Sequence, residues 1–196
     1  MAYIIAGLGN PGGEYTHTRH NTGRLVVEYL REKNACSEWK EEKKLKALFS
    51  EGEIAGERVK LLEPDNFMNN SGKSLAPLIT NKKKAQQLIV IYDDLDLPFG
   101  TFKIAFDRGS GGHKGIESIA RSTKTKGFVR IRVGISPVTP AGKPRKPKGE
   151  EKVVAFIMKN FKPEEIQTIK KLSKEIGEAV AIIIAEGHLI AMNKFN

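Results

Sequence analysis

The chain has a single cysteine and no long hydrophobic run. These two features argue against a disulfide framework, a cysteine-rich zinc site and a membrane span. Cys36 has no second cysteine with which to form a disulfide, and one thiolate cannot supply a zinc site of the cysteine-rich kind. The longest apolar run, AVAIIIA at 179–185, is far shorter than the about 20 residues that a membrane span requires. No basic and apolar leader of the signal-peptide type opens the sequence. We therefore expect a cytoplasmic protein that does not contact a membrane.

Acidic residues are also in short supply relative to basic ones. The 23 Asp and Glu residues stand against 33 Lys and Arg, which gives a net charge of +10 over 196 residues. Such an excess is typical of proteins that bind a polyanion, although a lysine-rich solvated surface of the heat-adapted kind is the alternative. The densest positive group, Lys143, Arg145, Lys146 and Lys148, falls within 136–151, where proline and glycine predict a mobile surface loop.

Strand-like and helix-like patterns alternate along the chain. This alternation predicts one α/β domain over 1–196, a sandwich with a central mixed β-sheet flanked by helices. A solvated turn or helix edge is expected for the charged run at 40–46. The expected strands lie at 2–8, within 48–64 on either side of Gly56, and at 86–100, 101–106 and 128–135. The expected helices lie at 22–34, within 66–80, at 116–122, and in a long amphipathic segment from Pro163.

The segment 7–21, GLGNPGGEYTHTRHN, carries the G-x-G-x-x-G spacing of dinucleotide-binding loops. In such loops the third glycine lies in the first turn of a helix, but here Pro11 intervenes and the helical pattern begins only near Thr22. The spacing alone is a weak signal. We interpret the segment as a turn at the end of a strand that presents Asn10 and His20.

Polar residues at the ends of other predicted elements complete a candidate site. Asp93 closes the apolar strand LIVIYD, Asn69 lies in FMNNSG and His113 in SGGHKG. A histidine, a carboxylate and amides without a reactive cysteine suggest a hydrolase in which His20 activates water and Asp93 holds the imidazole. Helix or turn capping is an equally supported role for Asp93, because DDLDLP is turn-like.

Two other kinds of chemistry are weaker interpretations. His17, His20, Asp93 and His113 offer zinc-ligand types, but a proline- and glycine-rich loop does not fix the spacing of the first two. Ser110 lacks the G-x-S-x-G context of a serine nucleophile. We therefore expect no metal and no cofactor.

Five blocks taken together resemble the bacterial-type peptidyl-tRNA hydrolase family. They are GLGNPGGEYTHTRHN, FMNNSG, DDLDLPFG, GSGGHKG and RIRVGI, in this order, and a looser similarity continues through VVAFIMKNF into the last helix. The resemblance implies an esterase, working without metal, that cleaves a peptide from the 3′ end of tRNA. It implies RNA, and not DNA, as the partner, and no dimer seam is evident, so a monomer is expected. A non-catalytic RNA-binding protein on the same fold is the rival interpretation.

The resemblance also implies roles for individual residues. His20 matches the general base, Asp93 the carboxylate that orients it, and Asn10 the residue that helps to distinguish peptidyl from aminoacyl esters. Arg132 matches a residue that contacts the tRNA 5′-phosphate, with Lys103 or Arg108 as its companion. The remaining positions implied in substrate binding are Tyr15, Phe67, Met68, Asn69, His113 and Lys114. Lys114 departs from the family block, which usually has asparagine there, so its role is the least defined.

Overall fold

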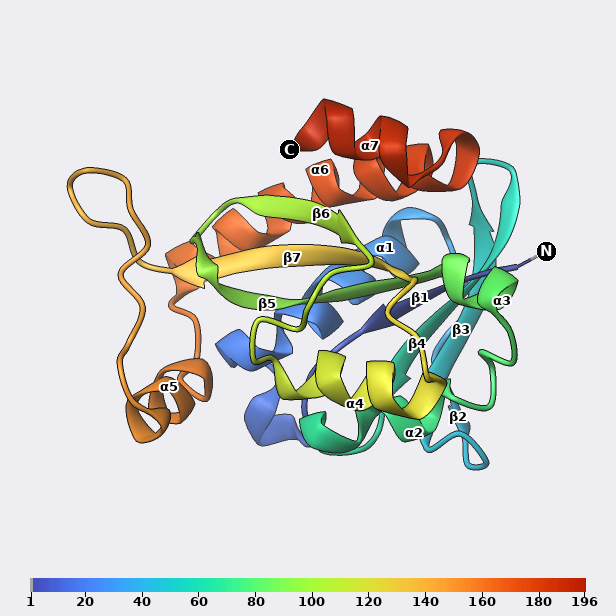
Figure 1. The fold of residues 1–196 in the computed structure, drawn as a ribbon, viewed down its shortest axis with the longest axis horizontal. Helices are drawn as coiled ribbons and strands as arrows, with labels where there is room; N and C mark the ends of the chain where they lie inside the picture. Colours follow the sequence, from blue (N-terminus) through green and yellow to red (C-terminus); the bar gives the residue numbers. More distant parts are fainter. Residues whose placement is uncertain (1) are drawn as a thin grey trace.

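A mixed β-sheet runs through the centre of the molecule (Figure 1). The structure is a computed structural model and describes residues 2–196. The strands are β1 (Tyr3–Gly7), β2 (Lys40–Glu42), β3 (Ala47–Ile54), β4 (Glu57–Pro64), β5 (Leu88–Pro98), β6 (Phe102–Phe106) and β7 (Val129–Ser136). They form one seven-stranded sheet in the order β2-β3-β4-β1-β5-β7-β6. The strands β4, β1, β5 and β7 are parallel, whereas β3 and β6 run antiparallel to their neighbours.

Helices cover both faces of this sheet, which confirms the predicted α/β sandwich. The helices are α1 (Thr22–Lys33), α2 (Ser71–Leu75), α3 (Lys82–Gln86), α4 (Lys114–Thr123), α5 (Glu150–Ile157), α6 (Pro163–Glu186) and α7 (His188–Phe195). Residues of α1 and α6 share one buried apolar cluster with the sheet, and residues of α2 and α4 share the other. Within residues 2–196, no helix combines the length and the apolar composition needed to cross a bilayer.

The central strand β5 explains why both faces need cover. Ile89 and Ile91 enter the cluster on the α1 and α6 face, and Val90 and Tyr92 enter the cluster on the opposite face. A parallel strand that is apolar on both sides is stable only between two helical layers. The polar residues that follow Tyr92 therefore emerge at the carboxyl edge of the sheet.

Several element boundaries differ from the sequence-based expectation, among them those of β2, α4 and α6. Lys40–Glu42 form the edge strand β2 rather than a turn or helix edge, because they pair with β3. The helix expected from residue 116 begins at Lys114, after His113 has capped it. The last helical segment divides at Gly187, whose φ of 94° favours glycine and ends α6.

The segment 137–149, followed by α5, extends from the end of β7 (Figure 1). The strand β7 includes Ser136 and α5 begins at Glu150, so the non-helical segment is slightly shorter than the expected loop. An isolated bridge joins Val138 to Pro144 within it. The four cations Lys143, Arg145, Lys146 and Lys148 are all exposed there, as the sequence suggested.

Candidate active site

Close approach of α1 to β1 places the first site segment. A Cβ on Gly7 would lie 2.5 Å from the Gly23 oxygen, and a Cβ on Gly23 would collide with the Ile91 oxygen. The glycines therefore let α1 pack directly against β1 and β5. The connection between β1 and α1 includes the short helical turn Arg19–Asn21, which carries His20.

His20 and Asp93 form a buried pair at the carboxyl edge of the sheet. The His20 Nδ1 atom lies 3.0 Å from each carboxylate oxygen of Asp93, whose side chain is 3% exposed. Asp93 accepts these bonds and does not cap a helix or a turn, so the structure separates the two interpretations that the sequence left open. Since α1 covers one face and α4 the other, the pair occupies a crevice of the kind that α/β sheets offer to ligands.

His113 supplies a second imidazole to the same carboxylate. Its Nε2 atom lies 3.1 Å from Asp93 Oδ1, and its Nδ1 atom accepts a hydrogen bond from the Ile116 N–H at 3.3 Å. An imidazole that accepts at Nδ1 carries its proton on Nε2, so His113 donates to Asp93. The carboxylate thus receives N–H donors from two sides.

These contacts keep Asp93 ionised. Burial by itself raises the pKa of Asp93, but electrostatic attraction to His20 and His113, including the hydrogen bonds from their N–H groups, outweighs burial and holds the pKa well below its usual range. An ionised carboxylate only accepts, so His20 must carry a proton on Nδ1. In neutral His20 the remaining nitrogen, Nε2, then has a free lone pair.

The ligand atoms of His20, Asp93 and His113 lie within 4.8 Å of one another, close enough to raise the question of a metal. A histidine that ligates through Nε2 normally donates its Nδ1–H to a second group. Here His113 Nδ1 accepts a hydrogen bond instead, which requires the proton on Nε2. The arrangement therefore favours a hydrogen-bonded triad over a metal centre. His17, the other zinc-ligand type considered from the sequence, is exposed and lies outside the group.

Asn10 is fixed by four hydrogen bonds. Its backbone exchanges two bonds with the Asn21 side chain, at 2.8 and 2.9 Å. Its side-chain oxygen accepts from the Met68 N–H at 2.9 Å, and its side-chain nitrogen contacts Met158 Sδ at 3.9 Å. The amide oxygen is thereby occupied, whereas the amide nitrogen has only a weak sulfur acceptor.

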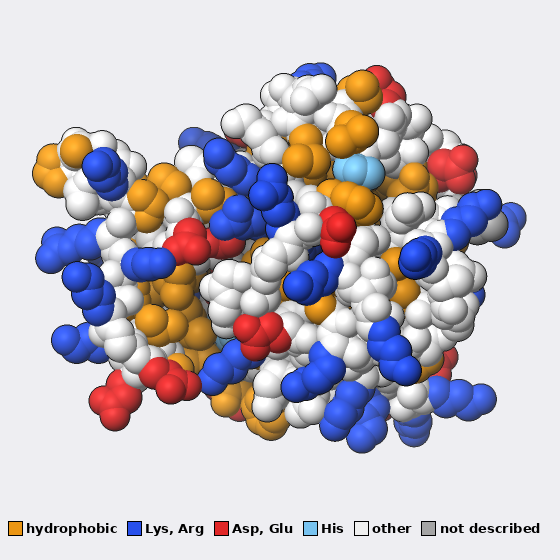
Figure 2. Space-filling model, viewed as in Figure 1, with side chains coloured by type: hydrophobic (Ala, Val, Ile, Leu, Met, Phe, Trp, Pro, Cys, Tyr) orange, Lys and Arg blue, Asp and Glu red, His pale blue; other side chains and the backbone are white. Residues whose placement is uncertain are grey.

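A cleft of about 600 Å³ opens in front of these groups. Asn10, His20, Asp93, His113 and Lys114 contribute to its polar side. The opposite side is apolar and comes from α5 and the residue after it, through Val153, Val154, Ile157 and Met158. Figure 2 shows hydrophobic side chains in the hollow beside the 137–149 segment, with both basic and acidic side chains around it.

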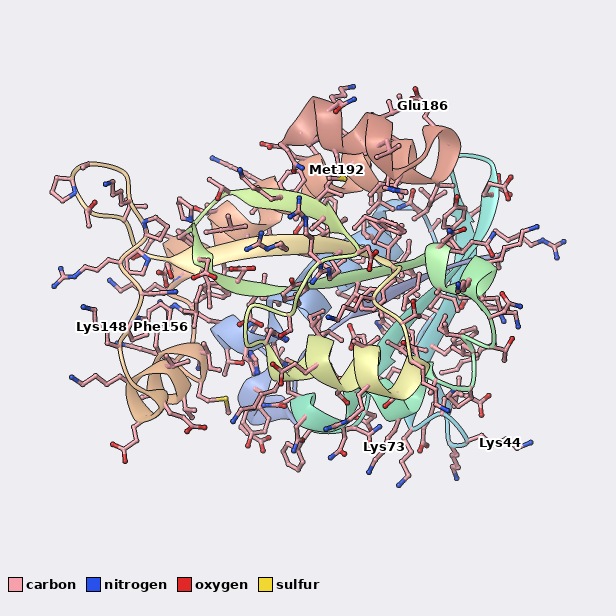
Figure 3. The ribbon with its side chains drawn as sticks, viewed as in Figure 1. Lys44, Lys73, Lys148, Phe156, Glu186 and Met192 are labelled. Carbon is pink, nitrogen blue, oxygen red and sulfur yellow. The ribbon has the colours of Figure 1, made fainter. Side chains whose placement is uncertain are left out.

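Ion pairs hold the α5 side of the cleft in place. Lys114 Nζ lies 3.1 Å from Glu150 Oε1, and Lys146 Nζ lies 2.5 Å from Asp96 Oδ1. At the other end of α5, the buried Arg19 donates to the Lys159 and Asn160 carbonyls and to Glu165. Its guanidinium also lies 4.8 Å from the ring of Phe156, which Figure 3 labels near Lys148.

A second, smaller cavity of about 310 Å³ lies beside the cleft and is strongly basic. Its lining includes Lys103, Arg108, Arg130 and Arg132. Arg132 Nε donates to Asp94 Oδ2 at 2.7 Å. Met192 of α7, labelled in Figure 3, contributes to the wall on the side of α7.

The predicted residues therefore fall into three groups. Asn10, His20, Asp93, His113 and Lys114 meet at the cleft, and Lys103 and Arg132 meet at the second cavity. Tyr15, Phe67, Met68 and Asn69 contribute to neither lining; Phe67 is 60% exposed and Met68 is buried against Asn10. Ser110 Oγ donates to Glu117 and is not paired with a histidine.

A buried carboxylate hydrogen-bonded to two imidazoles, in a crevice at the ends of parallel strands, is an arrangement typical of hydrolytic α/β enzymes. The family model described as peptidyl-tRNA hydrolase matches residues 4–196. The chain belongs to the peptidyl-tRNA hydrolase family.

Individual relatives agree with this assignment over nearly their whole length. The chain is 40% identical over 197 residues to a peptidyl-tRNA hydrolase of Herpetosiphon aurantiacus, covering 99% of this chain and 90% of that protein. It is 40% identical over 195 residues to the enzyme of Thermoanaerobacter sp., covering 99% of each. The crystal structure of the Acinetobacter baumannii peptidyl-tRNA hydrolase superposes with a TM-score of 0.87 at 30% identity, covering 100% of this chain and 94% of that one.

Proposed function

We propose that the protein hydrolyses the ester that joins a peptide to the 3′ end of tRNA, in the cytoplasm and without a metal. The observation that carries this proposal is the hydrogen bond from His20 Nδ1 to Asp93, which leaves Nε2 available as a base on a residue that lines the cleft. An ester requires an activated water and donors for the developing oxyanion, and the cleft offers both kinds of group.

In the proposed reaction His20 Nε2 takes a proton from a water molecule as the water oxygen attacks the ester carbonyl. Asp93 stabilises the imidazolium that forms, and His113 keeps Asp93 oriented by its own N–H. The tetrahedral intermediate collapses by breaking its bond to the ribose oxygen, which receives the proton from His20. The products are a tRNA with a free terminal hydroxyl and a peptide carboxylic acid, which loses its remaining proton to solvent and becomes the carboxylate.

Asn10 is the proposed contact to the peptide. Because the Met68 N–H occupies its side-chain oxygen, Asn10 can offer only its amide N–H to a substrate carbonyl. A carbonyl oxygen would be a far better acceptor than the Met158 sulfur at 3.9 Å. Phe67, Asn69 and Tyr15 lie outside the cleft lining, and we assign them to the outer part of the substrate.

The basic cavity is the proposed contact to the tRNA 5′-phosphate. The strand register places Lys103 of β6 directly opposite Arg132 of β7, so both side chains belong to the same face of the sheet. We therefore assign Lys103 as the companion of Arg132. Lys114 is engaged with Glu150, and we assign it to the cleft rim rather than to the peptide.

The test uses two matched substrates, N-acetyl-aminoacyl-tRNA and the same aminoacyl-tRNA without the acetyl group. We expect rapid release of the acetylated amino acid and much slower release of the free one. Release of both at the rate in buffer, together with tight tRNA binding, would instead indicate a non-catalytic RNA-binding protein.

A further inference from the structure

Arg130 is a buried cation with unused hydrogen-bonding capacity. The residue is 1% exposed, and only its Nη1 atom is paired, with the Gly109 carbonyl at 2.7 Å. Among residues 2–196, no atom lies within hydrogen-bonding geometry of its buried Nε and Nη2, and the Tyr92 phenol is the polar side chain that interacts with the guanidinium. Buried guanidinium nitrogens without partners are costly, and they lie here in the wall of the basic cavity. An anion in this cavity would offset that cost if the guanidinium turned toward it.

The strand register explains how this cation comes to lie beside the others. One row across three neighbouring strands contains Lys103, Arg132 and Tyr92, and the next row contains Ala105, Arg130 and Val90. Asp94 pairs with Arg132, whereas Arg130 has no carboxylate bonded to it within the described chain. A terminal phosphate, with a charge of about −1.5 to −2, matches this excess of positive charge better than a phosphodiester with one charge.

Tyr92 separates this cavity from the catalytic cleft. It contributes to the lining of both, and its ring centre lies 4.7 Å from that of His113. Burial raises the pKa of Tyr92 to about 12, although the nearby charge of Arg130 opposes this rise. The phenol therefore stays protonated, and the Tyr92 side chain contacts the His113 ring and shares the wall of the basic cavity with Arg130.

A second route leads from Arg130 to the same histidine. Gly109, which accepts the Nη1 bond, precedes Ser110, whose carbonyl accepts the His113 N–H at 3.2 Å. A shift of the guanidinium toward an anion would thus act on His113 through the 109–113 loop as well as through the Tyr92 ring.

We propose that Arg130 and Tyr92 are positioning residues that couple a terminal phosphate in the basic cavity to His113 and Asp93. The phosphate then does more than increase affinity: it fixes the imidazole that orients the catalytic carboxylate. This inference rests on the proposed function, because it assigns a catalytic consequence to the end of the tRNA that carries that phosphate.

The experiment compares N-acetyl-aminoacyl-tRNA bearing a 5′-phosphate with the same tRNA bearing a 5′-hydroxyl, in single turnover and over a range of enzyme concentrations. For the wild type we expect the phosphate to raise the saturating rate about tenfold, within the range of about 5- to 150-fold typical of coupled sites, and also to lower the half-saturating concentration.

Tyr92→Phe keeps the ring against His113 but removes the hydroxyl toward Arg130. We expect this variant to lose the phosphate effect on the saturating rate and to keep the effect on half-saturation. Arg130→Met should lose both effects, and Lys170→Met, on the exposed side of α6, should keep both.

A wild-type phosphate effect confined to half-saturation, or a Tyr92→Phe variant with the full rate effect, would overturn the coupling while leaving the proposed hydrolysis intact. Failure of the wild type to cleave either tRNA would instead overturn the proposed function. Circular dichroism of each variant shows whether it is folded, and Tyr92→Phe decides the question if Arg130→Met is not.

Discussion

The two neighbouring cavities differ in how their polar groups are satisfied. In the cleft, the ring nitrogens of His113 and the carboxylate of Asp93 are all paired within the protein. In the basic cavity, two of the three guanidinium nitrogens of Arg130 are buried and unpaired within residues 2–196. The protein itself completes the hydrogen bonds of His113 and Asp93, whereas we propose that an anion completes those of Arg130.

This difference fits the two roles that we propose for the cavities, catalysis and phosphate binding. Catalytic groups need fixed geometry before the substrate arrives, because a misplaced base loses much of its rate advantage. Phosphate-binding groups gain most when their donors are not already satisfied. Accordingly, His20 and His113 each donate to Asp93, whereas only one of the three guanidinium nitrogens of Arg130 has an acceptor within the described residues.

The largest expected effect comes from disrupting the hydrogen bonds of Asp93 in the catalytic cleft. Asp93→Asn should lower kcat by about 10²- to 10⁴-fold, because an amide can place a donor against His20 and favour the wrong tautomer. Binding of tRNA, measured by filter retention, should change little. A kcat within twofold of the wild type would show that Asp93 does not orient the base.

Asp93 also predicts a pH dependence of stability. Its pKa is lowered on folding, so its contribution is present above the unfolded pKa of about 4 and is lost as the pH falls toward the folded value. The difference in urea midpoint between the wild type and Asp93→Asn should be largest near neutral pH and shrink below about pH 4. A difference independent of pH would contradict the ionised buried carboxylate.

The next effect concerns cations outside both cavities. Each phosphate contact contributes about −0.7 to −0.9 to the slope of log K against log salt. Replacing Lys143, Arg145 and Lys148 with serine should flatten that slope for tRNA by up to about 2.7, with kcat on saturating substrate retained. Lys146→Ser alone should change the slope less than one of the other three substitutions made alone, because Asp96 already neutralises this lysine. An unchanged slope in the triple variant would mean that the segment is simply solvated.

A smaller effect is expected at the entrance of the basic cavity. Lys103→Met should weaken tRNA binding roughly 3- to 10-fold and remove about one phosphate contact from the salt slope. Arg108→Met, outside the Arg132 row, is the matched control and should have less effect. The reverse order would make Arg108 the companion of Arg132.

The smallest effect is expected at the cleft rim. The Lys114–Glu150 pair is exposed on both sides, and such pairs contribute about 0–1 kcal/mol. Glu150→Gln should leave the melting temperature nearly unchanged and tighten tRNA binding about two- to threefold, because Lys114 is then available to a phosphate. Weaker binding would show that Glu150 itself supports the substrate.

The pairing of His20 with Asp93 in the cleft was largely predictable from the sequence. LIVIYD identifies a buried strand that ends in a carboxylate, and the glycine-rich segment places His20 at the end of another strand. Pairing of parallel strands brings such ends together, so His20 and Asp93 could be joined without coordinates. The choice between pairing and capping for Asp93 required the structure, because both roles fit an acid after a strand.

The basic cavity around Arg130 was not predictable to the same degree. Alternation in RIRVGI marks Arg130 and Arg132 as one face of a strand, and alternating charges normally mark a solvated face. The 107–113 loop covers that face instead, and only the fold shows this. From the sequence, Tyr92 is expected to be a core residue. Its position between two cavities depends on long-range packing, which the sequence does not show. The apolar α5 wall was missed because its short pattern follows a proline-rich segment.

The most direct test of the account is a single-turnover assay of His20→Ala with N-acetyl-aminoacyl-tRNA, combined with its Kd for deacylated tRNA. We predict a rate about 10²- to 10⁴-fold below that of the wild type and a Kd within twofold of it, because base and phosphate contacts lie in different cavities. Hydrolysis by His20→Ala at the wild-type rate would contradict the central claim.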